Sequence, residues 1–266
     1  MLYQLNRAII KVTGADAYNF LQKLITVDLD VNKQTLYSCL LNNKGKYDYD
    51  FFISKIDDYF LIDINNHEVQ RFLQTLKMYK LIAKVNLEHL ENLSVVVVAS
   101  NSMLPEGYLC AYSDRLLDFI RCIVPSLGVK NSNITEYNYL RYKMAIPESE
   151  ELIVAKSIPL QCGMEELGAL SFNKGCYLGQ EFTNSSKHRM SIRHRIVPLK
   201  IIKDVNPLHK LNTIYSKDVE VGYILGREQD YVLAFILMKH HQDNLVCNGS
   251  ELICILPSWI QNFNTD

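Results

Sequence analysis

Several features that mark whole classes of protein are missing from this 266-residue sequence. The formal net charge is only −1, so the chain lacks the basic field of a dedicated nucleic-acid binder, and no direct nucleic-acid contact is expected. No apolar run reaches membrane-spanning length; the longest are short segments such as Leu93–Ala99. The first residues show neither a signal-peptide layout nor an Arg- and Ser-rich transit composition. We therefore expect a cytoplasmic protein without a membrane partner.

The cysteines lack the spacing of a closed metal or redox site. No two of the seven are arranged as C-x-x-C. Most lie in apolar runs, as Cys39 does within Leu36–Leu41 and Cys254 within Leu252–Leu256. These are expected to be reduced and buried, as is usual for a cytosolic protein. Cys176 alone has a polar setting flanked by glycines, which makes it the candidate reactive cysteine.

The stretch around this cysteine is the centre of the functional prediction. It consists of Lys174, Gly175, Cys176, Tyr177, Leu178, Gly179, Gln180 and Glu181. Glycine tolerates positive φ angles, so the thiol is expected on a tight, accessible turn. A nearby cation such as Lys174 favours the thiolate, which attacks electrophiles and binds metal, and Gln180 and Glu181 can hold the loop by hydrogen bonds. A turn with a small buried cysteine beneath it remains the alternative.

This octapeptide resembles the KGCYxGQE signature of the YgfZ family, and every fixed position of the signature is present. The resemblance implies a folate-binding, iron–sulfur cluster assembly protein with the fold of the T-protein, the aminomethyltransferase of the glycine cleavage system. A further partial match is the run from Phe20 to Asp28, which is similar to the family's LQGQLTND stretch. Lys23 and Val27 replace the usual glycine and asparagine there.

A hairpin is predicted after the turn at Asn42–Gly45. Tyr47, Tyr49, Phe51 and Ile53 alternate with polar residues, so they are expected to form one apolar face. Asp48 and Asp50 then share the opposite face, and a solvated sheet face is one interpretation. In the T-protein fold this strand borders a central folate cavity, and the resemblance implies that Asp50 contacts tetrahydrofolate. A carboxylate suits the adjacent donors of a reduced pterin.

A second folate residue is implied by a helical segment expected over Ile134–Ile146 and ended by Pro147. The run from Leu140 to Pro147 resembles the family element R-x-x-x-G-I-P, which marks Arg141 as a folate contact. Lys143 stands where T-proteins have a folate-holding glutamate, and this argues against aminomethyl transfer more than against folate binding. Arg141 as a packing arginine with a surface partner is the alternative.

The pattern of elements predicts an α+β fold of antiparallel sheets with helices. The resemblance adds a T-protein-like ring of three lobes with a C-terminal β-barrel. We expect a folate-binding region over residues 1–190, made of two lobes with a hinge near 125–133. Residues 191–266 then form the barrel domain. The basic segment Lys187–Arg189, near Cys176 in sequence, reads either as a source of positive charge for the thiol or as a solvated strand edge.

Three functions remain open. The first is an accessory factor for iron–sulfur cluster assembly or repair that uses folate, with Cys176 as a transient ligand or redox handle. One thiolate cannot hold a cluster that normally takes four protein ligands, so a client or carrier protein, glutathione or a second copy would share it. The second is a folate-dependent one-carbon transferase with Asp50 as its acid–base carboxylate. The third is a folate-binding scaffold without chemistry.

Overall fold

The computed structural model of this chain describes residues 2–29, 33–126, 134–189, 192–261 and 263, and it describes His188 and Arg189 by their backbone only. The expected hinge at 125–133 lies almost wholly outside these ranges. The chain forms two compact units. Unit 1 comprises Met1–Ile134 and Leu167–Gln180, and unit 2 comprises Thr135–Glu166 and Glu181–Asp266. Because the chain passes between the units more than once, a single domain boundary at residue 190 stays a prediction.

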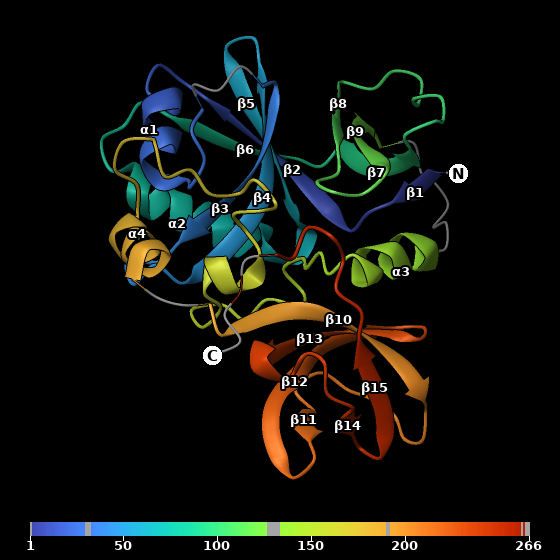
Figure 1. The fold of residues 1–266 in the computed structure, drawn as a ribbon. Coiled ribbons are helices and arrows are strands. Elements are labelled where there is room, and N and C mark those ends of the chain that lie inside the picture. Colours follow the sequence, from blue (N-terminus) through green and yellow to red (C-terminus); the bar gives the residue numbers. More distant parts are fainter. Residues whose placement is uncertain (1, 30–32, 127–133, 190–191, 262, 264–266) are drawn as a thin grey trace. The chain divides into compact units, whose positions relative to one another are not determined.

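Unit 1 contains a five-stranded sheet with two helices against it (Figure 1). The strand order is β3 (Thr35–Leu41), β4 (Tyr47–Ile56), β5 (Tyr59–Asn65), β2 (Arg7–Thr13) and β6 (Asn86–Leu90). Helix α1 (Ala17–Leu24) buries Phe20 and Leu21, and helix α2 (Val69–Lys80) buries Phe72 and Leu76, in one core with the sheet. The i, i+3, i+4 spacing of these residues gives each helix one apolar stripe.

A second sheet of unit 1 has the order β1 (Leu2–Gln4), β7 (Leu93–Ala99), β9 (Phe119–Pro125) and β8 (Cys110–Ser113). Its Val96, Val98, Cys122 and Val124 form a separate apolar cluster. Other side chains of β8 and β9 are polar and buried, and they meet charged groups of β2 and β5. A layer of buried, paired charges thus joins the two sheets. Such layers are uncommon, because a buried charge that loses its partner destabilises the fold strongly.

Unit 2 is built on a closed six-stranded barrel. Its strands, in order around the barrel, are β10 (His194–Lys203), β13 (Tyr231–Leu237), β12 (Val219–Glu228), β11 (Thr213–Ser216), β14 (Leu245–Cys247) and β15 (Ser250–Cys254). Helix α3 (Thr135–Lys143) packs on the barrel, where the hydroxyl of Tyr142 lies so close to Gly226 that an added Cβ would be 2.2 Å from it. Short 3₁₀ turns occur at Asn66–Glu68, Pro159–Cys162 and Met238–His240.

The predicted α+β fold with antiparallel sheets and a C-terminal barrel is confirmed, because every pairing between the named strands is antiparallel. The three-lobed ring concerns how the parts are arranged and stays a prediction. Strand β6 begins at Asn86 and pairs with β2 at the edge of the five-stranded sheet. Among the described helices, none is both long enough and apolar enough to cross a membrane.

Candidate functional site

The signature loop is fastened to the segment that follows α1. The backbone N–H of Leu178 donates to the carbonyl of Lys23, and that of Ser171 donates to the carbonyl of Thr26. The hydroxyl of Thr26 donates in turn to the carbonyl of Ala169 at 2.5 Å. All of these residues belong to unit 1, so the loop is held by contacts within one compact unit.

Lys174 is the main anchor of this loop. Its side chain is buried, and its Nζ donates three hydrogen bonds to backbone carbonyls: those of Gln22 (2.7 Å), Ile25 (2.8 Å) and Val27 (2.7 Å). An ammonium has three N–H groups, so none is left for a thiolate. Burial lowers the pKa of Lys174 to about 8, and the negative charge of Asp28 acts in the opposite direction. The geometry makes Lys174 a structural cation at the end of α1, where carbonyls carry partial negative charge.

The two signature glycines differ. Gly179 has a φ of +79°, and an added Cβ would lie 2.7 Å from the carbonyl oxygen of Asn42 and 2.9 Å from the Cα of Gly45. The loop therefore packs backbone to backbone on the turn between β3 and β4, and only glycine fits there. A Cβ on Gly175 would meet nothing within 4 Å, and Gly175 does not have a positive φ. Gly175 thus has no comparable steric requirement.

Cys176 is exposed, whereas the other six cysteines are not. Cys254 is half-buried and the remaining five are buried. Burial raises the pKa of the Cys122 thiol to about 11 and that of Cys254 to about 12, and it raises the pKa of Cys247 as well. The alternative of a cysteine buried beneath a turn does not describe Cys176.

The end of the signature is helical. Gln180 begins helix α4 (Gln180–Arg189), and its N–H donates to the carbonyl of Tyr177, whose ring is buried. Glu181 lies exposed in the first turn. The interpretation of Lys187 as part of a solvated strand edge is therefore wrong: it lies in α4 and forms an ion pair with Glu165. Helix α4 has no apolar stripe, so hydrophobic periodicity does not predict it.

Asp50 is buried and lies away from water, with 1% of its surface exposed, so a solvated face for this strand is wrong. It accepts hydrogen bonds from the hydroxyls of Tyr37 (3.0 Å) and Tyr47 (2.7 Å). Burial and the charge of Asp50 raise the pKa of both tyrosines, which keeps them protonated donors. Tyr47 was expected on the face of Tyr49, but a β-bulge opposite Leu40 and Leu41 shifts the register and lets it reach Asp50.

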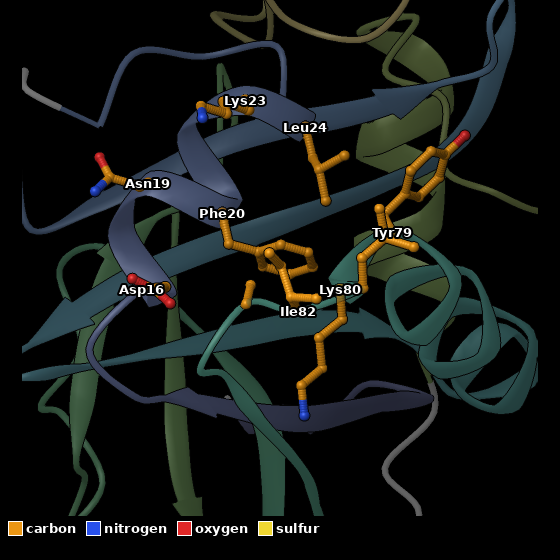
Figure 2. Close-up of a pocket in the computed structure, with 10 residues that line it drawn as sticks. Asp16, Asn19, Phe20, Lys23, Leu24, Tyr79, Lys80 and Ile82 are labelled. Atoms are coloured by element: carbon orange, nitrogen blue, oxygen red, sulfur yellow. The ribbon is translucent and has the colours of Figure 1, made fainter.

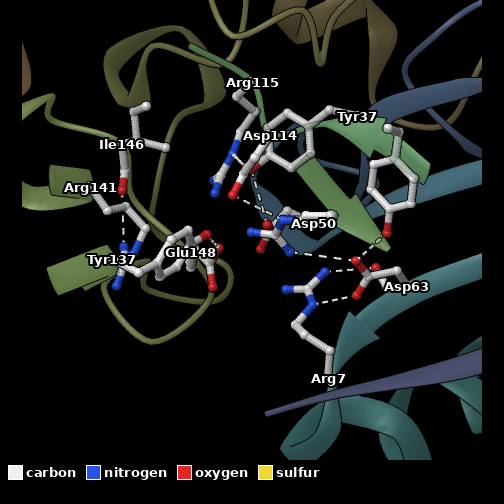
Figure 3. A network of polar contacts seen from close by, with 12 residues as sticks. Arg7, Tyr37, Asp50, Asp63, Asp114, Arg115, Tyr137, Arg141, Ile146 and Glu148 are labelled. Atoms are coloured by element: carbon white, nitrogen blue, oxygen red, sulfur yellow. Dashed lines mark hydrogen bonds and ion pairs between the residues drawn. The ribbon is translucent and has the colours of Figure 1, made fainter. Parts of the chain in front are cut away.

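Asp50 belongs to a wider layer of buried charge in unit 1. The carboxylate of Asp63 accepts from Arg7 (2.5 Å), from the hydroxyl of Tyr112 (2.7 Å) and from Arg121 (3.4 Å). Figure 3 shows Arg7 beside Asp63 in this layer. Its charged members are three arginines and three aspartates: Arg7, Arg115, Arg121, Asp50, Asp63 and Asp114. The formal charges cancel, which allows such a layer to persist in a low dielectric.

Glu68, at the start of α2, acts on this layer but was not predicted from the sequence. Its Oε1 pairs with Arg71 at 3.0 Å, while its Oε2 is buried without a hydrogen-bond partner. Burial raises the pKa of Glu68 to about 7, the charge of Asp50 adds to this rise, and Arg71 opposes it. A buried carboxyl group with an unused oxygen near a second carboxylate is a feature of binding sites.

Arg141 lies in unit 2, where both terminal nitrogens of its guanidinium are bonded and its Nε is buried without a hydrogen-bond partner. Its guanidinium forms a bidentate pair with Glu151 (2.8 and 3.1 Å) and donates to the carbonyl of Ile146 at 2.9 Å. The hydroxyl of Tyr142 also donates to Glu151. The negative charges of Glu151 and Glu148 raise the pKa of Arg141 against the effect of burial. These contacts agree with the interpretation of Arg141 as a packing arginine rather than a folate contact. Its partner Glu151, however, is buried and not at the surface.

The described residues include no cluster of three or more His, Cys, Asp or Glu side chains that could hold a metal ion. Asp63 and Arg121 were not predicted as site residues, although the sequence contains a signal for both. Each interrupts an apolar β-strand, Tyr59–Asn65 and Phe119–Pro125 respectively. A charge at a buried strand position is the signal that would have found them.

Taken as a whole, the chain has the fold of an aminomethyltransferase T of the glycine cleavage system. The crystal structure of that protein from Bartonella henselae matches with a TM-score of 0.76, and the match covers 99% of this chain and 87% of the Bartonella chain. The sequence identity is 14%, which shows the fold alone.

Curated relatives point to a particular group of proteins, those named "Iron-sulfur cluster assembly factor IBA57 homolog, mitochondrial". The one from Pyricularia oryzae is 29% identical over 225 residues, 73% of this chain and 55% of that protein. The one from Coccidioides immitis is 29% identical over 241 residues, 76% of this chain and 57% of that protein. The chain thus spans a little over half the length of the curated relatives it matches. No protein-family model matches the chain.

These comparisons correct one expectation. A further relative, from Neurospora crassa, is 28% identical, and the match covers 73% of this chain and 52% of that protein. All three relatives are named mitochondrial. The prediction of a cytoplasmic protein is therefore wrong. It was inferred from the absence of a transit composition in the first residues, which is not evidence about location when relatives are longer than the chain.

Proposed function

We propose that this chain is a mitochondrial iron–sulfur cluster assembly factor in which Cys176 binds the cluster transiently as it passes to another protein. The cluster is cargo. The observation that carries the proposal is the combination of an exposed thiol with a loop held by Lys174 and Gly179. Such a loop presents a soft thiolate donor at a fixed position, and thiolates are the ligands that iron–sulfur clusters select.

A shared cluster follows from the ligand count. Clusters usually take four protein ligands, and the loop supplies one exposed cysteine. A client or carrier protein, or glutathione, supplies the others. The curated relatives carry names of iron–sulfur cluster assembly factors, which supports this class of partner. The narrower YgfZ assignment is part of the same proposal, on the strength of the octapeptide.

The test is cluster binding without oxygen. The protein is incubated with ferric iron, sulfide and glutathione, and the visible absorption of a bound cluster is measured after gel filtration. Wild type and Cys254→Ser are expected to retain the cluster, while Cys176→Ser, which changes an exposed side chain only, does not. Equal retention by wild type and Cys176→Ser contradicts the proposal.

We also propose that Asp50 and Glu68 receive the pterin ring of tetrahydrofolate. The fit is chemical: two hydroxyls orient the Asp50 carboxylate, and Glu68 has a buried oxygen without a partner. Carboxyl groups suit the amino and ring N–H donors of a pterin. Arg141 fits less well, because Glu151 and the carbonyl of Ile146 already occupy its guanidinium. Bound tetrahydrofolate would supply a carrier for one-carbon units, but no observation beyond the fold favours a transferase.

Calorimetry with tetrahydrofolate tests this second proposal. Asp50→Asn is expected to weaken binding by roughly tenfold or more, since a charge-assisted hydrogen bond is lost. Asp57→Asn, at an exposed aspartate in the turn after β4, is the matched control and should bind as wild type does. If wild type does not bind tetrahydrofolate, or if both variants bind it equally well, the proposed folate site is contradicted.

A further inference from the structure

An apolar patch with a cavity beside it lies at the end of α2. Lys23 of α1, whose carbonyl accepts the N–H of Leu178 from the signature loop, is one of the residues that line the cavity. The cavity has a volume of about 590 Å³, and Figure 2 shows its lining. The residues around it come from α1 and from the turn after α2: Asp16, Asn19, Phe20, Lys23, Leu24, Tyr79, Lys80, Leu81, Ile82 and Ala83. All belong to unit 1.

The last turn of α2 and the residues that follow it expose large apolar side chains, of which Leu81 and Ile82 line the cavity. Ile82 is 98% exposed, Leu81 is 84% exposed and Met78 is 68% exposed. Leu81 also has a φ of +44°, a backbone conformation that bulky residues rarely adopt. Strain and exposed apolar surface at one turn both cost stability, and such outliers gather at functional sites.

The charge around the patch is positive although the chain as a whole is close to neutral. Lys23 and Lys80 line the cavity, and Lys77 and Lys84 flank the turn in sequence. The opposing carboxylate, Asp16, accepts a hydrogen bond from the backbone N–H of Lys84 at 2.7 Å. An apolar surface bordered by lysines is complementary to a surface that combines apolar and acidic side chains.

From these features we propose that the patch, defined by Met78, Tyr79, Leu81 and Ile82 together with the cavity, docks an acidic amphipathic helix of a partner protein. A helix laid across the rim covers the protruding residues and places one or two apolar side chains in the cavity, while its acidic face meets the lysines. A small molecule inside the cavity would leave Ile82 and Met78 in water. A lipid surface would take the protruding residues but would not fill a concave cavity.

Fluorescence anisotropy with a labelled synthetic peptide tests this proposal on the full chain. The probe is a short helix with Leu and Phe on one face and Glu on the other, and the control peptide has the same apolar face with Lys in place of Glu. Wild type is expected to bind the acidic peptide, more weakly at high salt, and not the basic one. Ile82→Ser should weaken binding by roughly tenfold or more, since apolar anchors dominate such interfaces.

Matched variants separate the patch from general effects. Met103 is 93% exposed in another loop of unit 1, so Met103→Ser should bind the peptide as wild type does. Lys80→Glu should weaken binding, whereas Lys55→Glu, at an exposed lysine outside the cavity, should not. Shifts of the Ile82 methyl resonance on peptide addition should place the helix on the patch.

Four outcomes would overturn the proposal: no binding of the acidic peptide by wild type, equal binding of both peptides, unchanged binding by Ile82→Ser, or self-association of wild type that Ile82→Ser abolishes. Co-sedimentation with anionic vesicles in the absence of peptide binding would assign the patch to a membrane surface instead. Because Ile82 is exposed, its replacement by serine is not expected to disturb folding.

Discussion

Replacing Lys174 by methionine removes a buried ammonium but keeps an unbranched side chain of similar length. Three charge-assisted hydrogen bonds of 2.7 to 2.8 Å disappear, and the carbonyls of Gln22, Ile25 and Val27 lose their partner. Hydrogen bonds to charged groups contribute about 1.5–3 kcal/mol each. The cost of burying the charge, which lowers the pKa of Lys174 to about 8, offsets part of this sum.

We therefore expect the free energy of unfolding to fall by about 2–4 kcal/mol in Lys174→Met, measured by urea denaturation with circular dichroism. Lys44→Met, at an exposed lysine in the turn between β3 and β4, is the control and should change it by less than about 0.5 kcal/mol. An unchanged transition in Lys174→Met would refute the anchoring role.

Thiol alkylation separates this role from the electrostatic one expected from the sequence. If Lys174 acted mainly on the thiolate, the methionine variant would fold normally, and alkylation of Cys176, followed by mass mapping, would move to higher pH. If Lys174 anchors the loop, the pH dependence of alkylation stays the same under conditions where the variant is folded, and only its stability falls.

Two further predictions concern Gly179 and Glu68. Gly179→Ala should lower the free energy of unfolding by about 2–4 kcal/mol, because Gly179 has a positive φ and the new Cβ would lie 2.7 Å from the carbonyl oxygen of Asn42. Gly175→Ala is the control and should leave the free energy of unfolding nearly unchanged. Equal effects of the two substitutions would show that the loop does not pack as described. The pKa of Glu68 is raised from 4.5 to about 7, so the folded state binds more protons than the unfolded state in that range, and stability should fall as pH rises through it. Glu68→Gln should remove this slope and be about 1–2 kcal/mol more stable than wild type above pH 7, since loss of the ion pair with Arg71 offsets part of the gain. Identical pH profiles of the two proteins by urea denaturation would contradict the raised pKa of Glu68.

Much of the fold could be predicted because its strands and helices carry regular apolar periods. The apolar run Leu93–Ala99 is a strand over its full length, and the hairpin expected at the turn Asn42–Gly45 is formed by β3 and β4. Helix α4 could not be found in this way, since Gln180–Arg189 has no apolar stripe and depends on its tertiary setting. The position of Tyr47 escaped prediction for another reason: a one-residue bulge reverses which face a side chain occupies, and periodicity cannot place a bulge.

The site was predictable in part. Glycine flanks and polar neighbours marked Cys176 as the accessible thiol, and its exposure agrees with that pattern. The role of Lys174 was not predictable. Its proximity in sequence to Cys176 suggested the thiol as its partner, but in the folded chain it donates to backbone carbonyls of residues about 150 positions earlier. Burial of Asp50 similarly comes from tertiary packing, in which Tyr37 and Tyr47 donate to it, and strand alternation does not reveal such packing.

Complementation tests the central claim most directly. In cells that lack this protein, the activity of mitochondrial iron–sulfur enzymes is measured after expression of wild type, Cys176→Ser or Cys254→Ser, with protein levels matched by immunoblot. We predict that wild type and Cys254→Ser restore the activity and that Cys176→Ser, although folded and present at the same level, does not. Full restoration by Cys176→Ser would contradict the proposal that this exposed thiol handles the cluster.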